Sequence, residues 1–210
     1  AIAPQVKPLN VVWIVLDACR ADRVGWAGYE RDTTPYLDEL AERGTVFLNH
    51  YTQGIWTELS VPSYMTGRYF PLACVDVSLT YPNREAPEEE ILFPRLLRDA
   101  GYYTAAFSAH AWFSPSGKLA RSFTEFHFVR PEDGQNIPAA EFTTINFKAL
   151  RWIRTNRMRL PFFLYIHALD THFPHHLNPP DDQWVDPDYE SEVVIDGIPT
   201  QNFTADFTPK

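Results

Sequence analysis

The sequence is poor in cysteine, has no long apolar run and carries no excess of positive charge. Its two cysteines, Cys19 and Cys74, exclude a framework of several disulfide bonds. No stretch is apolar over enough residues to span a membrane as a helix. The net charge of −9 argues against a protein that binds nucleic acid through the phosphate backbone. A small anionic substrate is still compatible with this charge, because a bound metal ion can reverse the local field.

Aromatic residues and proline are abundant. Aromatic side chains make up 15% of the sequence, and there are 18 prolines. The aromatic residues supply the apolar surface for burial that a disordered chain lacks. A chain of 210 residues is also long enough to form a proper core. We therefore expect a folded chain with long connections that are stiffened by proline.

Apolar runs alternate with amphipathic segments along the chain. Residues 11–16 form a continuous apolar run rich in β-branched side chains, which predicts a strand buried on both faces of a parallel sheet. Residues 35–43 have apolar side chains at helical spacing, and a proline opens this segment. The same reasoning predicts further strands at 45–48, 102–107 and 161–166, and further helices at 62–65, 88–100 and 142–155. The alternation indicates an α/β fold with a mainly parallel central sheet flanked by helices.

Unusual polar residues follow three of the predicted strands. Asp17 ends the first strand, residues 57–63 come after the second, and Asp170 and His172 come after the last. The carboxyl ends of parallel strands meet at one edge of an open α/β sheet, where ligands bind. We therefore expect these residues to converge. On position alone, Asp17 is either a hydrogen-bonded structural carboxylate or a ligand of a hard cation.

Five segments carry a more specific signal. In chain order they read VLDACRADRVG (15–25), DTTPYLDELAERGTVF (32–47), WTELSVPSYMTGRY (56–69), GYYTA (101–105) and PFFLYIHALDTHFP (161–174). In this order they resemble the N-terminal half of sulfatases, a family of the alkaline phosphatase superfamily. The resemblance covers most of the first 176 residues, and it implies an alkaline phosphatase-like fold that is incomplete in this chain.

The resemblance also implies how the chain is divided. Residues 1–176 are expected to be the N-terminal part of a sulfatase-like catalytic domain. Residues 177–210, which are rich in Pro, Asp and aromatic side chains, are expected to be a surface segment of the same domain. The family's later Ser-Asp-His-Gly segment, which supplies further metal ligands, does not occur in the sequence. We therefore expect the missing C-terminal half of the domain as a partner, and an exposed apolar sheet edge in its absence.

The spacing of one segment places the nucleophile. In sulfatases a Cys or Ser that is oxidised to formylglycine precedes a Thr-Gly pair, and counting back ten positions from Gly67 gives Thr57. Related members that transfer phosphoryl groups carry an unmodified Thr at this position. A rival alignment makes Ser60 the formylglycine precursor. It fails because Ser60 lies three residues too close to the Thr-Gly pair, and because Tyr64 stands where an Arg is expected.

The same resemblance assigns roles to these residues. Asp17 and Thr57 are expected to bind a divalent metal ion (Ca, Mg, Mn or Zn), with Thr57 as the catalytic residue. His172 and Ser60 are expected to bind an anionic ester substrate. A Thr cannot release sulfate by collapsing to an aldehyde, as a formylglycine hydrate can, so Thr57 favours a phosphoester over a sulfate ester. The alternative is a non-catalytic binding module or pseudoenzyme that lacks the later metal ligands.

Four other residues are weaker candidates or are assigned to the surface. Asp170 and His167 are expected to support the residues that hold the metal ion or the substrate. His110 follows the fourth segment, where sulfatases carry Gly-Lys-Trp-His, but the Lys is absent and leaves the alignment open. Lys118 is interpreted as a solvated surface residue.

Overall fold

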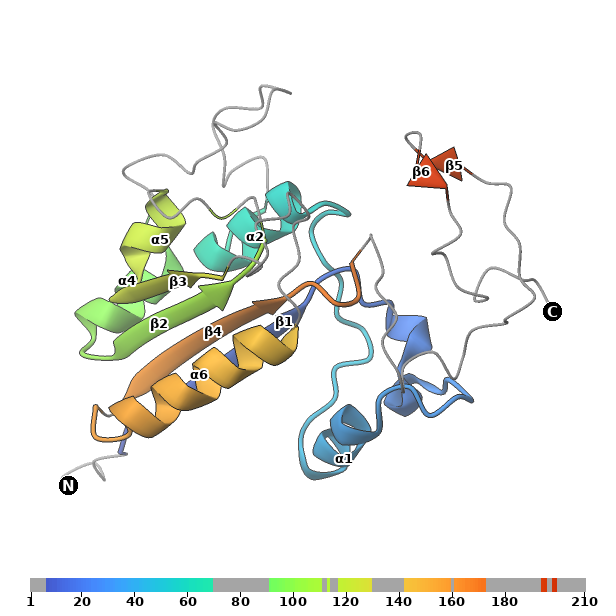
Figure 1. Cartoon of the computed structure of the whole chain (residues 1–210), viewed down its shortest axis with the longest axis horizontal. Coiled ribbons are helices and arrows are strands. Elements are labelled where there is room, and N and C mark those ends of the chain that lie inside the picture. The colour runs from blue at the N-terminus through green and yellow to red at the C-terminus, as the bar shows by residue number, and fades with distance from the viewer. Residues whose placement is uncertain are drawn as a thin grey trace.

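A parallel sheet forms the centre of the protein (Figure 1). The computed structural model describes residues 7–69, 91–110, 113, 117–129, 142–159, 161–172, 194–195 and 198–199. Its strands lie side by side in the order β1 (Val11–Leu16), β4 (Phe162–Ala168), β2 (Tyr103–Ser108) and β3 (Glu125–Phe128). Every neighbouring pair is parallel. A separate antiparallel pair is formed by β5 (Val194–Ile195) and β6 (Ile198–Pro199).

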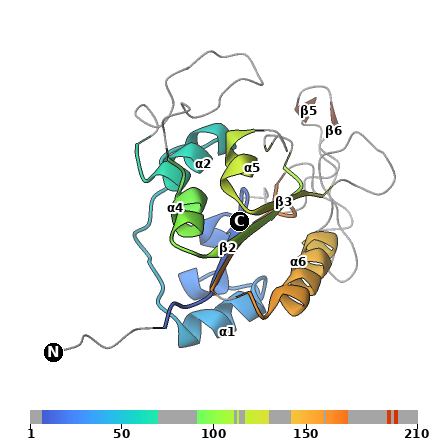
Figure 2. The same cartoon turned by 90° about the vertical axis from the view of Figure 1, so that its left-hand side faces the viewer.

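Helices cover both faces of the sheet (Figure 2). α6 (Phe142–Asn156) packs on β2 and β4 from one side. On the other side lie α2 (Thr57–Thr66), α4 (Phe93–Asp99) and α5 (Lys118–Ser122). α1 (Pro35–Arg43) contacts the short 3-10 turn η2 (Gly25–Ala27), which follows the turn η1 (Ala21–Arg23). The predicted α/β class with a mainly parallel sheet and flanking helices is confirmed.

The two faces of β4 contribute to different hydrophobic cores, because successive side chains of a strand point to opposite faces. Leu164 and Ile166 pack with residues of α6 in one core. Phe163 and Tyr165 pack with residues of α2 in the other. All of β4 is buried, which is typical of a central parallel strand. This strand is therefore a rigid support for the residues at its end.

Most element boundaries agree with the sequence. β2, β4, α1 and α6 lie within two residues of their predicted ranges. α2 begins at Thr57, five residues before the predicted start, because Pro62 lies inside the helix and does not open it. α4 begins at Phe93, with Pro94 in its first turn, where proline is well tolerated. The predicted start of that helix, at residues 88–90, lies outside the described residues.

The predicted strand at residues 45–48 is wrong. These residues form no strand, and Phe47 and Leu48 are each 73% exposed. An apolar run of four residues indicates a strand only if a neighbouring strand is available to pair with it. Here the run belongs to the connection between α1 and α2.

β1 is an edge strand of the described sheet, and the prediction that it is buried on both faces is wrong. It pairs with β4 alone among the described strands. Because α6 packs mainly on β2 and β4, Val12 and Ile14 remain 47% and 51% exposed. The apolar edge that we expected for an incomplete domain is therefore present in this part of the chain.

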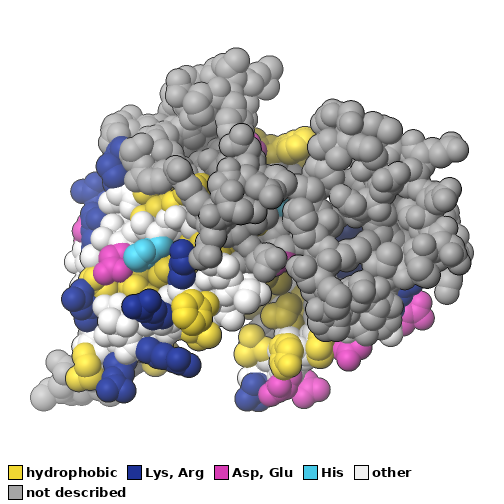
Figure 3. All heavy atoms as spheres, in the orientation of Figure 1, with side chains coloured by type: hydrophobic (Ala, Val, Ile, Leu, Met, Phe, Trp, Pro, Cys, Tyr) yellow, Lys and Arg dark blue, Asp and Glu magenta, His cyan; other side chains and the backbone are white. Residues whose placement is uncertain are grey.

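The outer face of α6 is basic. Lys148, Arg151 and Arg154 are exposed on it, and Figure 3 shows Lys and Arg side chains gathered over this helix. Cations near the end of a helix interact favourably with the negative end of its dipole. Of the helices in the described residues, none is both long and apolar enough to cross a membrane.

Glu125, at the start of β3, connects this strand to β2 and α6. Its carboxylate accepts hydrogen bonds from the Tyr103 hydroxyl, from Trp152 Nε1 (2.7 Å) and from His127 Nε2 (3.1 Å). Burial by itself raises the pKa of Glu125, but these hydrogen bonds outweigh it and hold the pKa below its usual value. The ionised carboxylate therefore contributes stability that is present above the unfolded pKa and is lost as the pH falls through the folded pKa.

Glu125→Gln is expected to lower the free energy of unfolding by about 1–2 kcal/mol near neutral pH, because an amide accepts weaker hydrogen bonds than a carboxylate. The loss should shrink in acid below the folded pKa, where the wild-type side chain is also neutral. Urea unfolding of the variant and the wild type, at neutral pH and in acid, measures the difference in free energy of unfolding at each pH. Glu39→Gln is the matched control, since Glu39 forms an exposed ion pair with Arg43 that contributes little. An equal loss at both pH values would contradict a role of the ionised form.

Candidate active site at the carboxyl ends of the strands

Three parallel strands bring polar residues to one edge of the sheet. Asp17 directly follows β1, His110 follows β2, and His172 follows β4. The backbone N–H of Asp17 donates to the carbonyl of Ala168 (3.0 Å), so the pairing of β1 with β4 continues into the site. Of the residues expected to converge, Asp17 and His172 lie together at this edge.

The chain turns sharply directly after Asp17. Ala18 has a φ of 58°, in the left-handed region, which costs a residue with a Cβ about 1–2 kcal/mol. From the turn after β4, the Thr171 hydroxyl donates to the backbone carbonyl of Asp17 (2.6 Å). Strained residues of this kind are often found beside functional groups. Here the turn fixes the orientation of Asp17, and therefore of its carboxylate, at the end of β1.

Thr57, the first residue of α2, lies against this carboxylate. Its hydroxyl donates to Asp17 Oδ2 (3.1 Å) and lies 3.3 Å from His110 Nε2. The first turn of an α-helix has backbone N–H groups without partners in the helix, and it is the positive end of the helix dipole. Both features favour negative charge next to Thr57. The position therefore suits an oxygen nucleophile that attacks an anionic ester.

Asp17 is held in its ionised form. Burial raises its pKa, but the hydrogen bond and charge of His167, the charge of His110 and the hydroxyl of Thr57 outweigh burial and leave the pKa below its usual value. The hydrogen bonds from Thr57 and His167 both end on Oδ2. Among the described residues, Oδ1 receives no hydrogen bond. A cation can therefore bind Oδ1 without displacing either partner.

His110 lies close to both Thr57 and Asp17. Its Nε2 is 3.6 Å from Asp17 Oδ2, and its ring centroid is 5.6 Å from that of His167 and 6.0 Å from that of His172. Burial and the charges of His167 and His172 lower the pKa of His110 to about 4, although Asp17 acts in the opposite direction. His110 is therefore neutral near neutral pH, and one of its ring nitrogens can accept a proton or bind a metal ion.

The residues at this edge fit a divalent metal ion. One ligand atom each from Asp17, His110 and His172 lie within 4.8 Å of one another. A carboxylate and two imidazoles form a donor set that suits a divalent transition metal, and Thr57 Oγ1 lies beside two of them. The sequence predicted Asp17 and Thr57 as ligands and did not include His110 among them. The signal for His110 was its position three residues after a predicted strand, where sulfatases carry Gly-Lys-Trp-His.

The other predicted residues have different surroundings. Ser60 lies one turn after Thr57, and its hydroxyl donates to the carbonyl of Trp56, the N-cap residue of the same helix (3.1 Å). Asp170 is exposed in the turn after β4. The prediction that Lys118 is solvated is wrong, since it is buried at the start of α5, which packs on α4 and β3. The general tendency of lysine to be exposed does not account for this packing.

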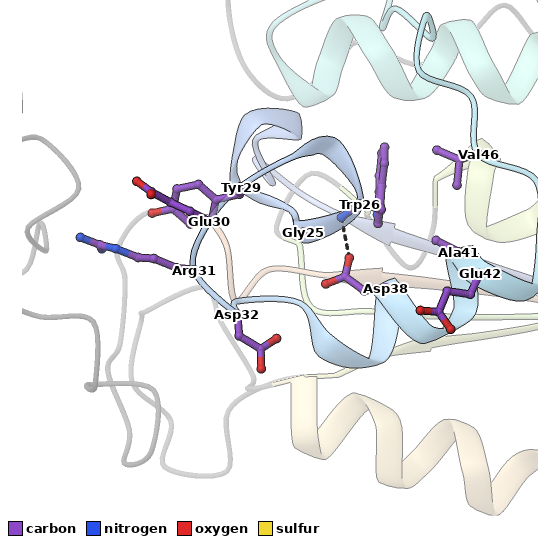
Figure 4. A pocket seen from close by; sticks show the side chains of 10 residues that line it. All are labelled: Gly25, Trp26, Tyr29, Glu30, Arg31, Asp32, Asp38, Ala41, Glu42 and Val46. Carbon is purple, nitrogen blue, oxygen red and sulfur yellow. Dashed lines mark hydrogen bonds between the residues drawn. The ribbon is translucent and has the colours of Figure 1, made fainter.

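A separate hollow of about 580 Å³ lies between η2 and α1 (Figure 4). Asp38 accepts a hydrogen bond from the backbone N–H of Trp26 (2.7 Å), and a Cβ at Gly25 would clash with the Asp38 carboxylate. The contact therefore joins η2 to α1. The hollow is lined by Gly25, Trp26, Tyr29, Glu30, Arg31, Asp32, Asp38, Ala41, Glu42 and Val46, and none of the candidate site residues is among them.

Comparison with known protein families gives a match over most of the chain. A sequence model of the sulfatases matches residues 9–196. The steryl-sulfatase of Mus musculus is 31% identical over 109 residues, which are 49% of this chain and 18% of that protein. The chain therefore spans less than a fifth of the length of this curated relative.

Solved structures share the fold. The C-terminal periplasmic domain of EcEptC from Escherichia coli, in complex with Zn, has a TM-score of 0.61 at 19% identity, covering 82% of this chain and 47% of that one. The soluble domain of lipooligosaccharide phosphoethanolamine transferase A from Neisseria meningitidis has a TM-score of 0.59 at 16% identity, covering 81% and 47%. A protein of the alkaline phosphatase superfamily from Vibrio parahaemolyticus has a TM-score of 0.60 at 20% identity, covering 83% and 43%. The fold predicted from the sequence is confirmed, and the chain spans about half the length of these structures.

Proposed function

Because the chain belongs to the sulfatase family, we propose that it carries the nucleophile-bearing half of a metal-dependent active site that cleaves or transfers an ester of phosphate or a related anion. The observation that carries this proposal is the contact between Thr57 and Asp17. In it, a hydroxyl at the N-terminus of a helix meets an ionised carboxylate at the end of a strand. The chain spans about half of the structures that it matches, and we propose that further ligands come from the part of such a domain that it does not span.

The proposed metal ion is bound by Asp17 and Thr57, with His110 and His172 within reach. Imidazole nitrogens favour Zn²⁺ or Mn²⁺ over Ca²⁺ and Mg²⁺, which prefer oxygen ligands alone. The complex of the Escherichia coli domain with Zn supports the same choice. Such an ion polarises the ester and stabilises the charge that develops on its oxygens.

The proposed reaction begins with attack of Thr57 Oγ1 on the phosphorus of the ester. The Thr57 proton passes to His110 Nε2, which lies 3.3 Å away and is neutral. The bond from phosphorus to the leaving oxygen breaks, and that oxygen takes up a proton that is delivered through His172, so an alcohol departs. Water or an acceptor alcohol then resolves the phosphoryl ester on Thr57 by in-line attack.

A phosphoester or phosphonate is the proposed substrate, because Thr57 has no route through an aldehyde. One of the matched structures is a phosphoethanolamine transferase, which supports transfer of a phosphoryl-type group. Ser60 and His172 are proposed to contact the anionic group.

The full-length protein is expected to turn over p-nitrophenyl phosphate or phosphonate at least about tenfold faster than p-nitrophenyl sulfate, a difference of ~1.4 kcal/mol in activation free energy. Turnover should require added Zn²⁺ or Mn²⁺. Release of p-nitrophenol measures all three esters under one set of conditions. A preference for the sulfate ester would contradict the proposal. Metal binding without turnover of any ester would favour the non-catalytic alternative.

A further inference from the structure

A chain of hydrogen bonds runs from Asp17 into the core. His167 Nε2 lies 2.9 Å from Asp17 Oδ2, and His167 Nδ1 lies 2.7 Å from the Tyr165 hydroxyl. The Tyr165 hydroxyl in turn lies 2.6 Å from the Tyr64 hydroxyl. Tyr165 and His167 are 0% and 1% exposed. Burying polar groups in this way is costly unless all of them are paired, and here each has a partner.

The donors and acceptors in this chain have a defined direction. An ionised carboxylate only accepts hydrogen bonds, so His167 Nε2 must carry the proton that faces Asp17. When the His167 ring carries only this proton, Nδ1 accepts a hydrogen bond from the Tyr165 hydroxyl. The Tyr165 oxygen accepts from Tyr64. Burial raises the pKa of Tyr64 and Tyr165, so both keep their hydroxyl protons and remain donors.

The far end of the chain is on the helix that carries the proposed nucleophile. Tyr64 and Thr57 are both in α2, two helical turns apart. The helix is therefore attached to the sheet at two points, by Thr57 on Asp17 and by Tyr64 on Tyr165. Because His167 connects Tyr165 to Asp17, the contacts form a closed ring that includes the carboxylate and the nucleophile.

Aromatic packing holds this ring in place. The Trp13 ring lies 5.2 Å from that of Tyr64 and 6.0 Å from that of Tyr165. Phe113 packs edge-on against His167, with 4.9 Å between ring centroids. Since these contacts involve the rings and not the hydroxyl groups, Tyr→Phe substitutions keep them and remove only the hydrogen bonds.

We propose that Tyr64, Tyr165 and His167 are positioning residues, which hold the Asp17 carboxylate and α2 in the relative geometry that metal binding and attack by Thr57 require. The inference rests on the proposed function, because Asp17 must be a metal ligand. Residues that hydrogen-bond to a metal ligand and orient it typically lower metal affinity by about 10–100-fold when they are removed.

The test compares metal binding by four variants of the full-length protein, measured by calorimetric titration with Zn²⁺ and Mn²⁺. His167→Leu is expected to weaken binding by about 10–100-fold, and Tyr165→Phe by about tenfold. His167→Gln keeps an N–H donor that can reach Asp17 and should recover most of the affinity. Tyr102→Phe is the matched control, because Tyr102 packs at the border of the same core outside the ring of contacts, and it should bind like the wild type.

A second readout separates positioning from general stability. In ¹⁵N NMR spectra of the imidazole, the wild type should show the proton of His167 on Nε2, and Tyr165→Phe should weaken this preference for one tautomer. The variants should also lower kcat more than they raise KM, since ground-state binding of the ester does not depend on Asp17 alignment. Wild-type metal affinity in both His167→Leu and Tyr165→Phe would overturn the inference.

Asp17→Asn distinguishes failure of this inference from failure of the proposed function. If Asp17→Asn abolishes metal binding while His167→Leu and Tyr165→Phe bind normally, the metal site stands and the positioning role is wrong. If Asp17→Asn binds the metal ion like the wild type, the proposed metal site is wrong and the positioning role is overturned with it.

Discussion

Thr57→Ala is expected to lower kcat/KM of the full-length protein for p-nitrophenyl phosphate by ~10³-fold or more, because the variant lacks the hydroxyl that forms the proposed covalent ester. The Thr57 hydroxyl is the group at the N-terminus of α2 that contacts both Asp17 and His110. Its loss removes the attacking atom and leaves the fold intact, since Thr57 lies in the first turn of the helix. Steady-state kinetics and circular dichroism of the variant test both parts of this expectation.

Three further variants test whether the loss of activity in Thr57→Ala is due to the Thr57 hydroxyl itself. Thr57→Ser keeps a hydroxyl and should keep most of the activity. Thr66→Ala makes the same chemical change at the other end of α2, where the hydroxyl donates to the Pro62 carbonyl, and should have little effect. Ser60→Ala tests the rival alignment. Full activity in Thr57→Ala together with none in Ser60→Ala would make Ser60 the nucleophile.

Asp17→Asn is expected to weaken binding of Zn²⁺ or Mn²⁺ by ~10²-fold or more, with a parallel loss of activity. The amide has the shape of the carboxylate but lacks the charge that a divalent cation requires. In the wild type this charge is present near neutral pH, because the hydrogen bonds and charges around Asp17 lower its pKa despite burial. Calorimetric titration of the purified, metal-free protein measures the change.

Asp22→Asn is the control for loss of charge. Asp22 is an exposed carboxylate in η1 that forms an ion pair with Arg20 (2.7 Å), and exposed pairs contribute little. The variant should bind the metal ion like the wild type. Equal affinities of the Asp17→Asn variant and the wild type would remove Asp17 from the metal site.

The sequence predicted the fold well where one pattern decided the structure. The short apolar run at 161–166 predicts a buried strand, and nearly all of it lies in the fully buried β4. The helical spacing at 142–155 gave α6 almost to the residue. The five segments in order also identified the family, which the match over residues 9–196 confirms. The roles of Asp17, Thr57, Ser60 and His172, and the division at residue 176, stay predictions.

Features that depend on pairing between strands could not be predicted. Residues 45–48 have the composition of a strand but lack a partner, and β1 is exposed because it has one neighbour in the described sheet. The contacts of His110 depend on the placement of β2 two strands away from β1. The link from His167 to Tyr64 joins residues about a hundred positions apart, so no local pattern reveals it. His175, His176 and most of residues 177–210 lie outside the described residues.

In the proposed reaction, Thr57 itself becomes covalently modified. The most direct measurement is mass spectrometry of the 57–68 peptide from the full-length protein, quenched with acid during turnover of a p-nitrophenyl phosphate ester. The proposed function predicts one phosphoryl group on Thr57 and an unmodified Ser60. Formylglycine at Ser60 with an unmodified Thr57 would contradict it, and would make the chain part of a sulfatase that works through an aldehyde.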